Sequence, residues 1–441
     1  MEGVSRPSYT SLEVLAGVFG CSGSLVVVSD TLYPRVGKAG LTSYPVLVKS
    51  VGDWIVVWVG GSSKGLRHGL RVVVAPGVGV FGGWRFGIYG ESVEPLEVFG
   101  AHALSAVVDR VLEVRPSRLV ADLTHGVNYM VVSLARAVLE AARVFSASSG
   151  LSVGVEMFNS EPVEEGVGSA RIHRVSRVGF EPRRAAEEIA FGLSRQRGEA
   201  RHYKVVSSSP EVGRSLGDVC EWGFVREVQR LARSASTALL YNMPLAALYI
   251  AAEVEGLSGG RPLLSKVAGL LELCRAQTIK HTVIEPSGEG YVVVHRAALS
   301  LEGVTRTLYS AALLDYIAGA VADSLGWVPD LEELDVRGVR IVELEEVSGR
   351  LGSLYEAIAR SELAQLRDRC ELGVRGGCEL AVGKERWPER ACEESSLDER
   401  NLKAHAGLER NVVEGRLAEG ELYLRYRRGC WDLVKRRLES I

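Results

Sequence analysis

The chain has 441 residues, of which 46% are hydrophobic and 24% charged, and its formal net charge at pH 7 is −3. This composition is typical of soluble globular proteins and excludes the disordered and fibrous classes. A charge so close to zero also excludes a protein that coats nucleic acid through a broad basic surface, so any nucleic-acid site must be local. The length predicts roughly two to four domains.

The first third of the chain alternates predicted strands and helices. Four apolar runs rich in β-branched residues predict buried strands, at 25–28, 45–48, 54–59 and 72–74. The glycine-dense segment 77–90 then predicts a loop that can approach a ligand closely. Beyond it the patterns predict in turn a helix, a strand, a helix and a strand, at 101–114, 119–123, 131–145 and 153–158. This order implies a βαβ unit and a parallel sheet, in which ligands bind beyond the carboxyl ends of the strands.

After about Gly179 the pattern becomes helical. The apolar spacing predicts helices at 182–193, 225–231, 234–252 and 263–278. The uncharged stretch 234–252 is about long enough to cross a membrane, but its polar residues and Pro244 favour a buried helix bent at that proline, so no membrane contact is expected. Two strands around Pro-Ser-Gly-Glu-Gly predict a hairpin, at 281–285 and 291–295. The loop-rich segment 371–394 leads to a predicted final pair of helices.

Neither the start of the chain nor its cysteines indicate secretion. Residues 1–10 carry no basic segment followed by an apolar run, so we expect a cytoplasmic protein. The seven cysteines include no pair at zinc-finger spacing, so free structural thiols and no metal site are expected. Cys370, Cys378 and Cys392 lie close together in the sequence, and whether they form a disulfide is left open.

The segment Asp-Leu-Thr-His-Gly-Val-Asn, residues 122–128, lies where the sheet predicts a ligand site, at the end of a strand and the start of a helix. The Thr124 hydroxyl and the His125 ring can donate or accept hydrogen bonds, and Gly126 lets main-chain N–H groups approach an anion. The alternative is that Thr124 only caps the helix and His125 is a surface histidine.

A second constellation lies near the C-terminus, where Ser396 and Glu399 predict a capping box and the start of a helix. Five residues would share one face of that helix: Leu397, Asn401, His405, Leu408 and Val412. Arg400 and His405 would point about 140° apart on a regular helix, so either the first turn is distorted or another chain completes the pair. The alternative is a core histidine and a solvated arginine. Gly407, poor for a helix interior, predicts close packing against another backbone.

These segments resemble a known family. Residues 122–128 resemble the string Asp-(Leu/Val)-Thr-His-Gly-(Val/Ile)-Asn of the CARF domain, the sensor of Csx-type ribonucleases in type III CRISPR systems. Residues 156–162 resemble a second segment of that domain, and residues 76–79 resemble its glycine loop. Residues 400–408, Arg-Asn-Leu-Lys-Ala-His-Ala-Gly-Leu, resemble the HEPN ribonuclease motif of the same proteins.

The resemblance implies a Rossmann-like α/β CARF domain at 1–180 and an all-α HEPN domain at 261–441, joined by a helical connector at 181–260, for which a helix-turn-helix-like arrangement is the alternative considered. It also implies a homodimer, or a higher oligomer, whose sensors form one symmetric pocket for cyclic tetra-adenylate or a ring of another size. This messenger would be the allosteric activator, and no cofactor is required. The implied pocket residues are Ser29, Asp30, Thr31, Gly77, Thr124, His125, Gly126, Asn128, Asn159 and Ser160.

RNA cleavage by the 2′-hydroxyl needs proton transfer and stabilisation of an anionic phosphorane, and it needs no metal. His405 is the predicted acid–base group because a histidine ring exchanges a proton near neutral pH. Arg400 would hold phosphate oxygens, and Asn401 would orient the ring or the phosphate. The product would end in a 2′,3′-cyclic phosphate. Single-stranded RNA is expected to contact Lys403, Arg425, Arg427 and Arg428. A solvated terminal helix is the alternative for the last three.

The main alternative function is a ligand-responsive transcription regulator without nuclease activity. It would need a basic recognition helix, for which Arg226, Arg230 and Arg233 are the nearest candidates. A metal-dependent nuclease would need an acidic cluster at ligand spacing, whereas the acidic run at 330–335 is typical of a helix start. We therefore expect an endoribonuclease of CRISPR defence that cyclic oligoadenylate activates.

Overall fold

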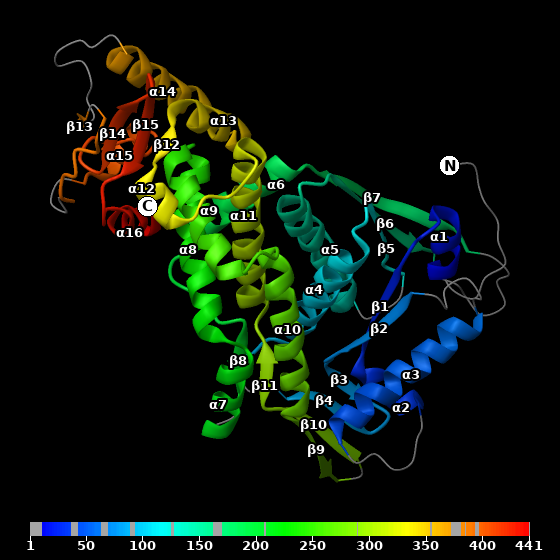
Figure 1. Ribbon diagram of the computed structural model, residues 1–441. Helices are drawn as coiled ribbons and strands as arrows, with labels where there is room; N and C mark the ends of the chain where they lie inside the picture. The colour runs from blue at the N-terminus through cyan, green and yellow to red at the C-terminus, as the bar shows by residue number, and fades with distance from the viewer. Residues whose placement is uncertain are drawn as a thin grey trace.

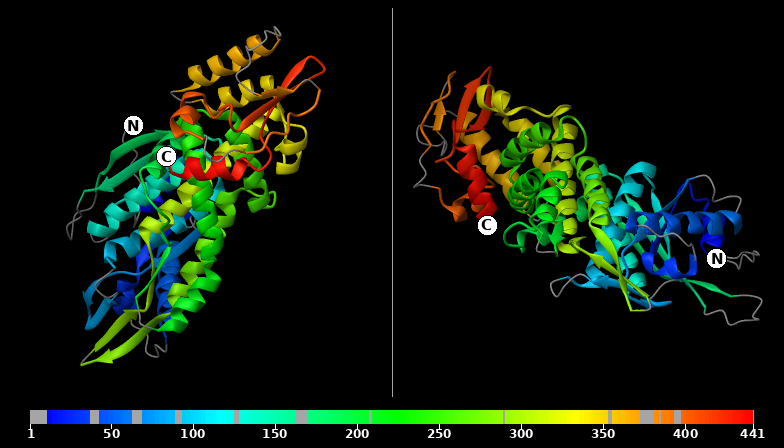
Figure 2. Two further views of the ribbon diagram at one scale, coloured as in Figure 1. Left: turned by 90° about the vertical axis from the view of Figure 1, so that its left-hand side faces the viewer. Right: turned by 90° about the horizontal axis from the view of Figure 1, so that it is seen from below.

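The computed structural model describes residues 11–36, 43–62, 69–88, 93–124, 128–161, 170–206, 209–288, 290–352, 355–371, 381–383, 385–392 and 397–440. The molecule is elongated: the N-terminal strands lie at one end, the C-terminal hairpin lies at the other, and long helices run between them (Figures 1 and 2). One hydrophobic core extends from Ala75 to Leu438. The middle helices therefore share their core with both ends.

The N-terminal end is an α/β structure, as the sequence predicts. Its elements are α1 (Ser11–Phe19), β1 (Ser24–Ser29), η1 (Asp30–Leu32), α2 (Tyr33–Val36), α3 (Tyr44–Ser62), β2 (Leu70–Ala75), β3 (Gly79–Phe81), β4 (Trp84–Ile88), α4 (Pro95–Val114), β5 (Arg118–Asp122), α5 (Asn128–Ser149), β6 (Val153–Ser160) and β7 (Ile172–Phe180). β1 pairs in parallel with β2, and β5 with β6, while β7 runs antiparallel to β6. Helices α4 and α5 pack on each other and on these strands. The predicted βαβ unit is confirmed in β5, α5 and β6.

The strands predicted at 45–48 and 54–59 are wrong, because both runs belong to the helix α3. The buried residues of this helix recur every four positions, at Leu47, Val51, Ile55 and Val59, and Val57 is exposed. That period is helical. The β-branched composition suggested strands, but short apolar runs do not distinguish a strand from a buried helix.

The middle of the chain is helical. Its elements are α6 (Pro182–Ser194), β8 (Tyr203–Val205), α7 (Pro210–Val219), α8 (Trp222–Leu240), α9 (Pro244–Ser258), α10 (Leu263–Lys280), β9 (Thr282–Ser287), β10 (Gly290–His295), β11 (Ala297–Leu299) and α11 (Leu301–Leu325). The predicted single helix bent at Pro244 is two helices, because α8 ends before Asn242, whose φ is +47°, and Pro244 starts α9. Within the described residues, no helix is long and apolar enough to cross a membrane.

The predicted hairpin is confirmed in β9 and β10, and it links the middle of the chain to the N-terminal end. β10 pairs in parallel with β4, so that one sheet has the order β3-β4-β10-β9. The rings of Tyr291 and Trp84 stack with their centroids 4.5 Å apart. Gly290 allows this approach, because a Cβ atom there would lie 1.8 Å from the carbonyl oxygen of Gly83. The hairpin thus connects α10 directly to the N-terminal strands β3 and β4.

The C-terminal end combines helices with a small sheet. Its elements are α12 (Leu331–Val336), β12 (Val339–Arg340), α13 (Ile341–Leu351), α14 (Glu356–Glu371), β13 (Ala381–Gly383), α15 (Glu399–Ala404), β14 (Val413–Ala418), β15 (Glu421–Tyr426) and α16 (Trp431–Ser440). The expected final pair of helices is instead a short helix, a hairpin and a helix. Glu419 and Gly420 form the hairpin turn with φ of +56° and +83°, the signs that a tight primed turn requires.

The expectation of free thiols is also corrected. Cys220 pairs with Cys274, and Cys392 pairs with Cys430. The latter disulfide joins the segment before α15 to the residue before α16. Cys392 therefore does not pair with Cys370, which is itself disulfide-bonded.

Candidate functional site

The polar residues that follow β1 form a buried cluster. The carboxylate of Asp30 is fully buried and accepts hydrogen bonds from the Gly77 main-chain N–H (2.7 Å) and the Tyr44 hydroxyl (2.8 Å). The Ser29 hydroxyl accepts hydrogen bonds from the Thr31 N–H and hydroxyl. Burial raises the pKa of Asp30 to about 7. These contacts fix the loop after β1, because its polar groups are hydrogen-bonded to other buried groups of the protein.

Gly77 makes this cluster possible. A Cβ atom at this position would lie 1.9 Å from the Ser29 Oγ and 2.9 Å from a Thr31 methyl carbon. The atoms that Gly77 approaches belong to Ser29 and Thr31, so the predicted approach to a ligand stays a prediction. The loop predicted at 77–90 is wrong in part, because it contains the strands β3 and β4. Ser29, Asp30, Thr31 and Gly77 are hydrogen-bonded mainly to one another, so these polar atoms are largely satisfied within the protein.

The second cluster lies at the carboxyl ends of β5 and β6. The Thr124 N–H and hydroxyl both donate to Asp122 Oδ1 (3.0 and 2.5 Å), and the Ser160 N–H donates to Thr124 Oγ1 (3.1 Å). Thr124 thus joins the two strand ends. Asn128 and Asn159 are exposed beside them. His125 and Gly126 lie outside the described residues.

Tyr129 connects the two clusters. Its hydroxyl accepts a hydrogen bond from the Val78 N–H (3.1 Å), which ties the glycine loop to the first turn of α5. The sequence analysis missed Tyr129 and Tyr44. The position of Tyr129, directly after the string 122–128, was the available signal. The structure therefore brings the described members of the predicted pocket to one edge of the parallel strands.

At the other end of the molecule, His405 follows the last turn of α15. Its Nδ1 lies 3.2 Å from Glu362 Oε2 on α14, and the two side chains are 39% and 24% exposed. A carboxylate that accepts from Nδ1–H fixes the tautomer whose Nε2 carries a lone pair. The ring is thereby oriented with Nε2 available for proton transfer. Glu362 was missed, since nothing distinguishes it among the acidic residues of α14.

The predicted helix around His405 is shorter than expected. α15 ends at Ala404, and the chain turns through Ala406 and Gly407, whose φ angles are +50° and +79°. A Cβ atom on Gly407 would lie 3.2 Å from Met243 Cβ and 3.3 Å from the Tyr426 hydroxyl. The prediction that another backbone packs against Gly407 is wrong, because its close neighbours are side chains and its positive φ explains the glycine. The shared face from Leu397 to Val412 is also wrong, because the helix stops before His405.

Arg400 and Asn401 are exposed on α15. The Asp398 carboxylate caps the helix by accepting from the Arg400 N–H (2.8 Å). The capping residue is thus Asp398, whereas Ser396 lies outside the described residues. The turn that carries Arg400 is a regular, capped helical turn.

Two of the predicted RNA contacts are corrected by their burial. The Arg425 guanidinium pairs with Glu414 (2.7 Å), and these side chains are 8% and 0% exposed. Arg427 is also buried and donates to the Arg410 carbonyl (2.7 Å). Both arginines hold the terminal hairpin in place, because their partners lie inside the protein. Arg428 is exposed, and the ammonium of Lys403 lies 5.4 Å from the Tyr241 ring centroid.

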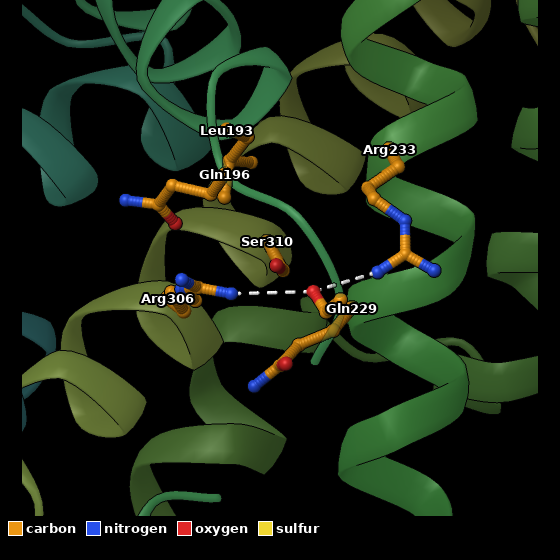
Figure 3. Close-up of a pocket in the computed structure, with 7 residues that line it drawn as sticks. Leu193, Gln196, Gln229, Arg233, Arg306 and Ser310 are labelled. Carbon is orange, nitrogen blue, oxygen red and sulfur yellow. Dashed lines mark hydrogen bonds between the residues drawn. The ribbon is translucent and has the colours of Figure 1, made fainter. Parts of the chain in front are cut away.

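Figure 3 shows a separate small cavity, partly open to solvent, between α6, α8 and α11. Arg233 and Arg306 converge there on the carbonyl of Gly198 (2.8 and 3.2 Å). None of the predicted site residues lines this cavity. Its arginines fasten the loop after α6, so the cavity belongs to neither candidate site.

Comparison with protein families identifies both ends of the chain. The family model described as CRISPR system endoribonuclease Csx1, CARF domain, matches residues 1–162, which include both strand-end clusters. The model described as CRISPR system endoribonuclease Csx1, HEPN domain, matches residues 353–428, which include Glu362, Arg400 and His405. Together the two matches cover slightly more than half of the chain.

None of the curated proteins matches the chain. The two domains follow in the order that the sequence motifs predict, and they are those of a ligand-responsive, CRISPR-associated ribonuclease. The chain therefore belongs to the CARF–HEPN ribonucleases of CRISPR systems, of the Csx1 type.

Proposed function

We propose that this protein cuts single-stranded RNA without a metal when cyclic oligoadenylate, with cyclic tetra-adenylate as the first candidate, binds to its CARF domain. The observation that carries the proposal is the pairing of His405 with Glu362 inside the segment that the HEPN model matches. This pair presents an oriented, half-exposed imidazole, which is the group that general acid–base cleavage of RNA requires.

In the proposed reaction, Nε2 of His405 takes the proton of the ribose 2′-hydroxyl. The resulting oxygen attacks the adjacent phosphorus, the bond to the 5′-oxygen breaks, and that oxygen receives the proton that Nε2 of His405 has taken up. The exposed guanidinium of Arg400 stabilises the negative charge of the phosphorane. The products end in a 2′,3′-cyclic phosphate and a 5′-hydroxyl. Every step uses groups of the protein, and Asn401 on the same helix orients the phosphate.

We further propose that two copies of the chain form the active site. Arg400 lies on a regular turn capped by Asp398. A distorted first turn finds no support in this helix, and because α15 ends before His405 the separation of about 140° that both explanations assumed does not apply. The other explanation, completion by a second chain, also suits a twofold symmetric messenger, which requires an isologous sensor interface.

For the messenger, the exposed amides of Asn128 and Asn159 beside the strand ends are the proposed direct contacts. An amide group can donate and accept at once, as recognition of an adenine edge requires. Thr124 and Ser160 hold these amides in place through their own hydrogen bond. The buried cluster of Asp30 and Gly77 supports the opposite wall of the pocket.

The alternative function, a ligand-responsive transcription regulator without nuclease activity, has less support. Of its candidate recognition arginines, Arg233 pairs with Glu199 (3.1 Å) and Arg230 with Glu439 (3.5 Å). These guanidinium groups are engaged within the protein, on a helix that packs in the centre of the molecule. A DNA-reading helix needs such groups free to enter the major groove.

The test is cleavage of fluorescently labelled single-stranded RNA in EDTA, with and without cyclic tetra-adenylate. We expect messenger-dependent cutting by the wild type, and a loss of about 10²–10⁴-fold in His405→Ala, because the acid–base group is removed. His173→Ala is the matched control, since His173 is an exposed histidine of β7 that likewise pairs with a glutamate, Glu161. Full cutting by His405→Ala, or no cutting with any ring size, would contradict the proposal.

A further inference from the structure

Three buried side chains capable of binding a metal meet in the middle of the molecule. His202 precedes β8, Cys220 ends α7, and Cys274 lies in α10. One ligand atom from each lies within 4.8 Å of the other two, and all three residues are fully buried. Figure 1 shows α7, β8 and α10 next to one another. The cluster is remote in sequence from both candidate functional sites.

In the oxidised form, Cys220 and Cys274 make a disulfide, and the imidazole of His202 lies beside it. The ring is near the Cys220 main chain, but neither nitrogen makes a hydrogen bond of normal geometry within the described part of the chain. A buried polar group without a partner costs about 1–3 kcal/mol. The disulfide thus accounts for the two cysteines, whereas the His202 ring packs against Tyr203 and Trp222 without a regular hydrogen bond at its nitrogens.

We propose that reduced Cys220 and Cys274 bind Zn²⁺ together with His202. Two thiolates and an imidazole are a preferred zinc ligand set, with Zn–S distances of about 2.3 Å and Zn–N distances of about 2.0–2.1 Å. A tetrahedral ion of these dimensions holds its ligand atoms about 3.6 Å apart, so shifts of about 1 Å complete the site. One coordination position stays open for water or a small exogenous ligand.

The disulfide and the metal site are alternative states of the same residues. Reduction breaks the bond between the two sulfurs with two electrons and two protons from a dithiol, which itself becomes a disulfide. Each thiol then releases its proton when it binds Zn²⁺. Either state fastens α7 to α10, and α10 continues into the β9–β10 hairpin that pairs with the sensor strand β4. Bound Zn²⁺ would therefore still link α7 to α10 under reducing conditions, in which the disulfide is broken.

No metal site was predicted, because no two cysteines of the sequence have zinc-finger spacing. Cys220 and Cys274 lie 54 residues apart. The second disulfide offers a contrast. Cys392 and Cys430 belong to no group of three potential ligands among the described residues. This pair is the matched control for the proposed site.

The experiment uses the full-length protein, reduced with a phosphine, desalted without oxygen and titrated with Zn²⁺ against a colorimetric chelator. We expect one Zn²⁺ per chain for the wild type and for Cys392→Ser/Cys430→Ser, and none for Cys220→Ser/Cys274→Ser. His202→Asn should weaken binding by at least about tenfold, since an imidazole ligand is lost. Oxidised protein should bind no ion at this site.

Far-UV circular dichroism reports whether each variant is folded. If the double serine variant unfolds, the test is instead made with Co²⁺ added to the reduced protein. Thiolate-to-cobalt absorption should appear in the wild type and change in His202→Asn. Reduced, folded wild type that binds no Zn²⁺, or equal affinity in His202→Asn, would overturn the proposal.

Discussion

At the sensor end, the polar side chains that follow β1 are buried and bonded to one another, whereas at the ribonuclease end Arg400 and Asn401 are exposed and His405 has one orienting contact. Asp30, Gly77 and Ser29 form a frame whose members depend on each other. The proposed catalytic side chains lie on or directly after a short helix that is capped by Asp398 and followed by the turn at Gly407. Substitutions at the sensor should therefore change stability, and those at the catalytic helix should change the rate of cleavage.

The strongest challenge to that contrast is Arg425, a buried charge at the ribonuclease end. In Arg425→Ala, the fully buried carboxylate of Glu414 loses its partner. We expect the free energy of unfolding to fall by about 3–5 kcal/mol, as for other broken buried ion pairs. Urea unfolding followed by circular dichroism measures this loss.

Arg428→Ala is the control, because Arg428 is exposed and such a substitution should change stability by no more than about 0.5 kcal/mol. An Arg425→Ala variant with wild-type stability and weakened RNA binding would restore the original prediction that Arg425 contacts RNA.

At the catalytic helix, Arg400→Ala should lower kcat/KM for RNA by about 10²–10³-fold, because a donor to the anionic transition state is removed. The side chain is exposed, so the melting temperature should stay that of the wild type. Steady-state cleavage at saturating messenger measures the rate. Arg410→Ala, another exposed arginine of the HEPN match, should cleave normally. Wild-type cleavage by Arg400→Ala would remove this residue from the mechanism.

At the sensor, Gly77→Ala should lower the free energy of unfolding by about 1–3 kcal/mol, because the added Cβ overlaps the Ser29 hydroxyl. It should also raise the messenger concentration needed for half-maximal cleavage. Gly52→Ala on α3 is the control, since its Cβ would meet the nearest atom at 3.9 Å. An unchanged unfolding curve for Gly77→Ala would show that the cluster is not tightly packed.

The sequence predicted those features that depend on residues close together in the chain. The strand-end string at 122–128, the βαβ order and the 282–295 hairpin each have a local pattern of apolar, turn and capping residues. The strands predicted within α3 are wrong, because the prediction relied on the many β-branched residues there. The four-residue period of the buried residues, which is typical of a helix, was present in the sequence but was not used. The helix through Val412 failed because Ala406 adopts a positive φ, which few non-glycine residues do.

Contacts between residues far apart in the sequence could not be predicted from local patterns. Glu362 and His405 are 43 positions apart, and Tyr44 and Asp30 meet only after α3 packs on the end of β1. Arg425 was read as a free charge because the hairpin was read as helix. In the hairpin register Arg425 faces Glu414, so recognising the Glu419-Gly420 turn would have shown the ion pair.

The smallest effect is expected at Glu362, which touches His405 and not the RNA in the proposed mechanism. Glu362→Ala should lower kcat by about tenfold, or about 1.4 kcal/mol, because the ring loses its orientation and its fixed tautomer. KM should stay unchanged, and Glu362→Gln, which keeps an acceptor oxygen, should recover part of the rate. Glu356→Ala, on the same helix but paired with Arg360, is the control. A rise in KM with normal kcat would instead place Glu362 in RNA binding. His405 would then lack the one contact that is proposed to orient its ring.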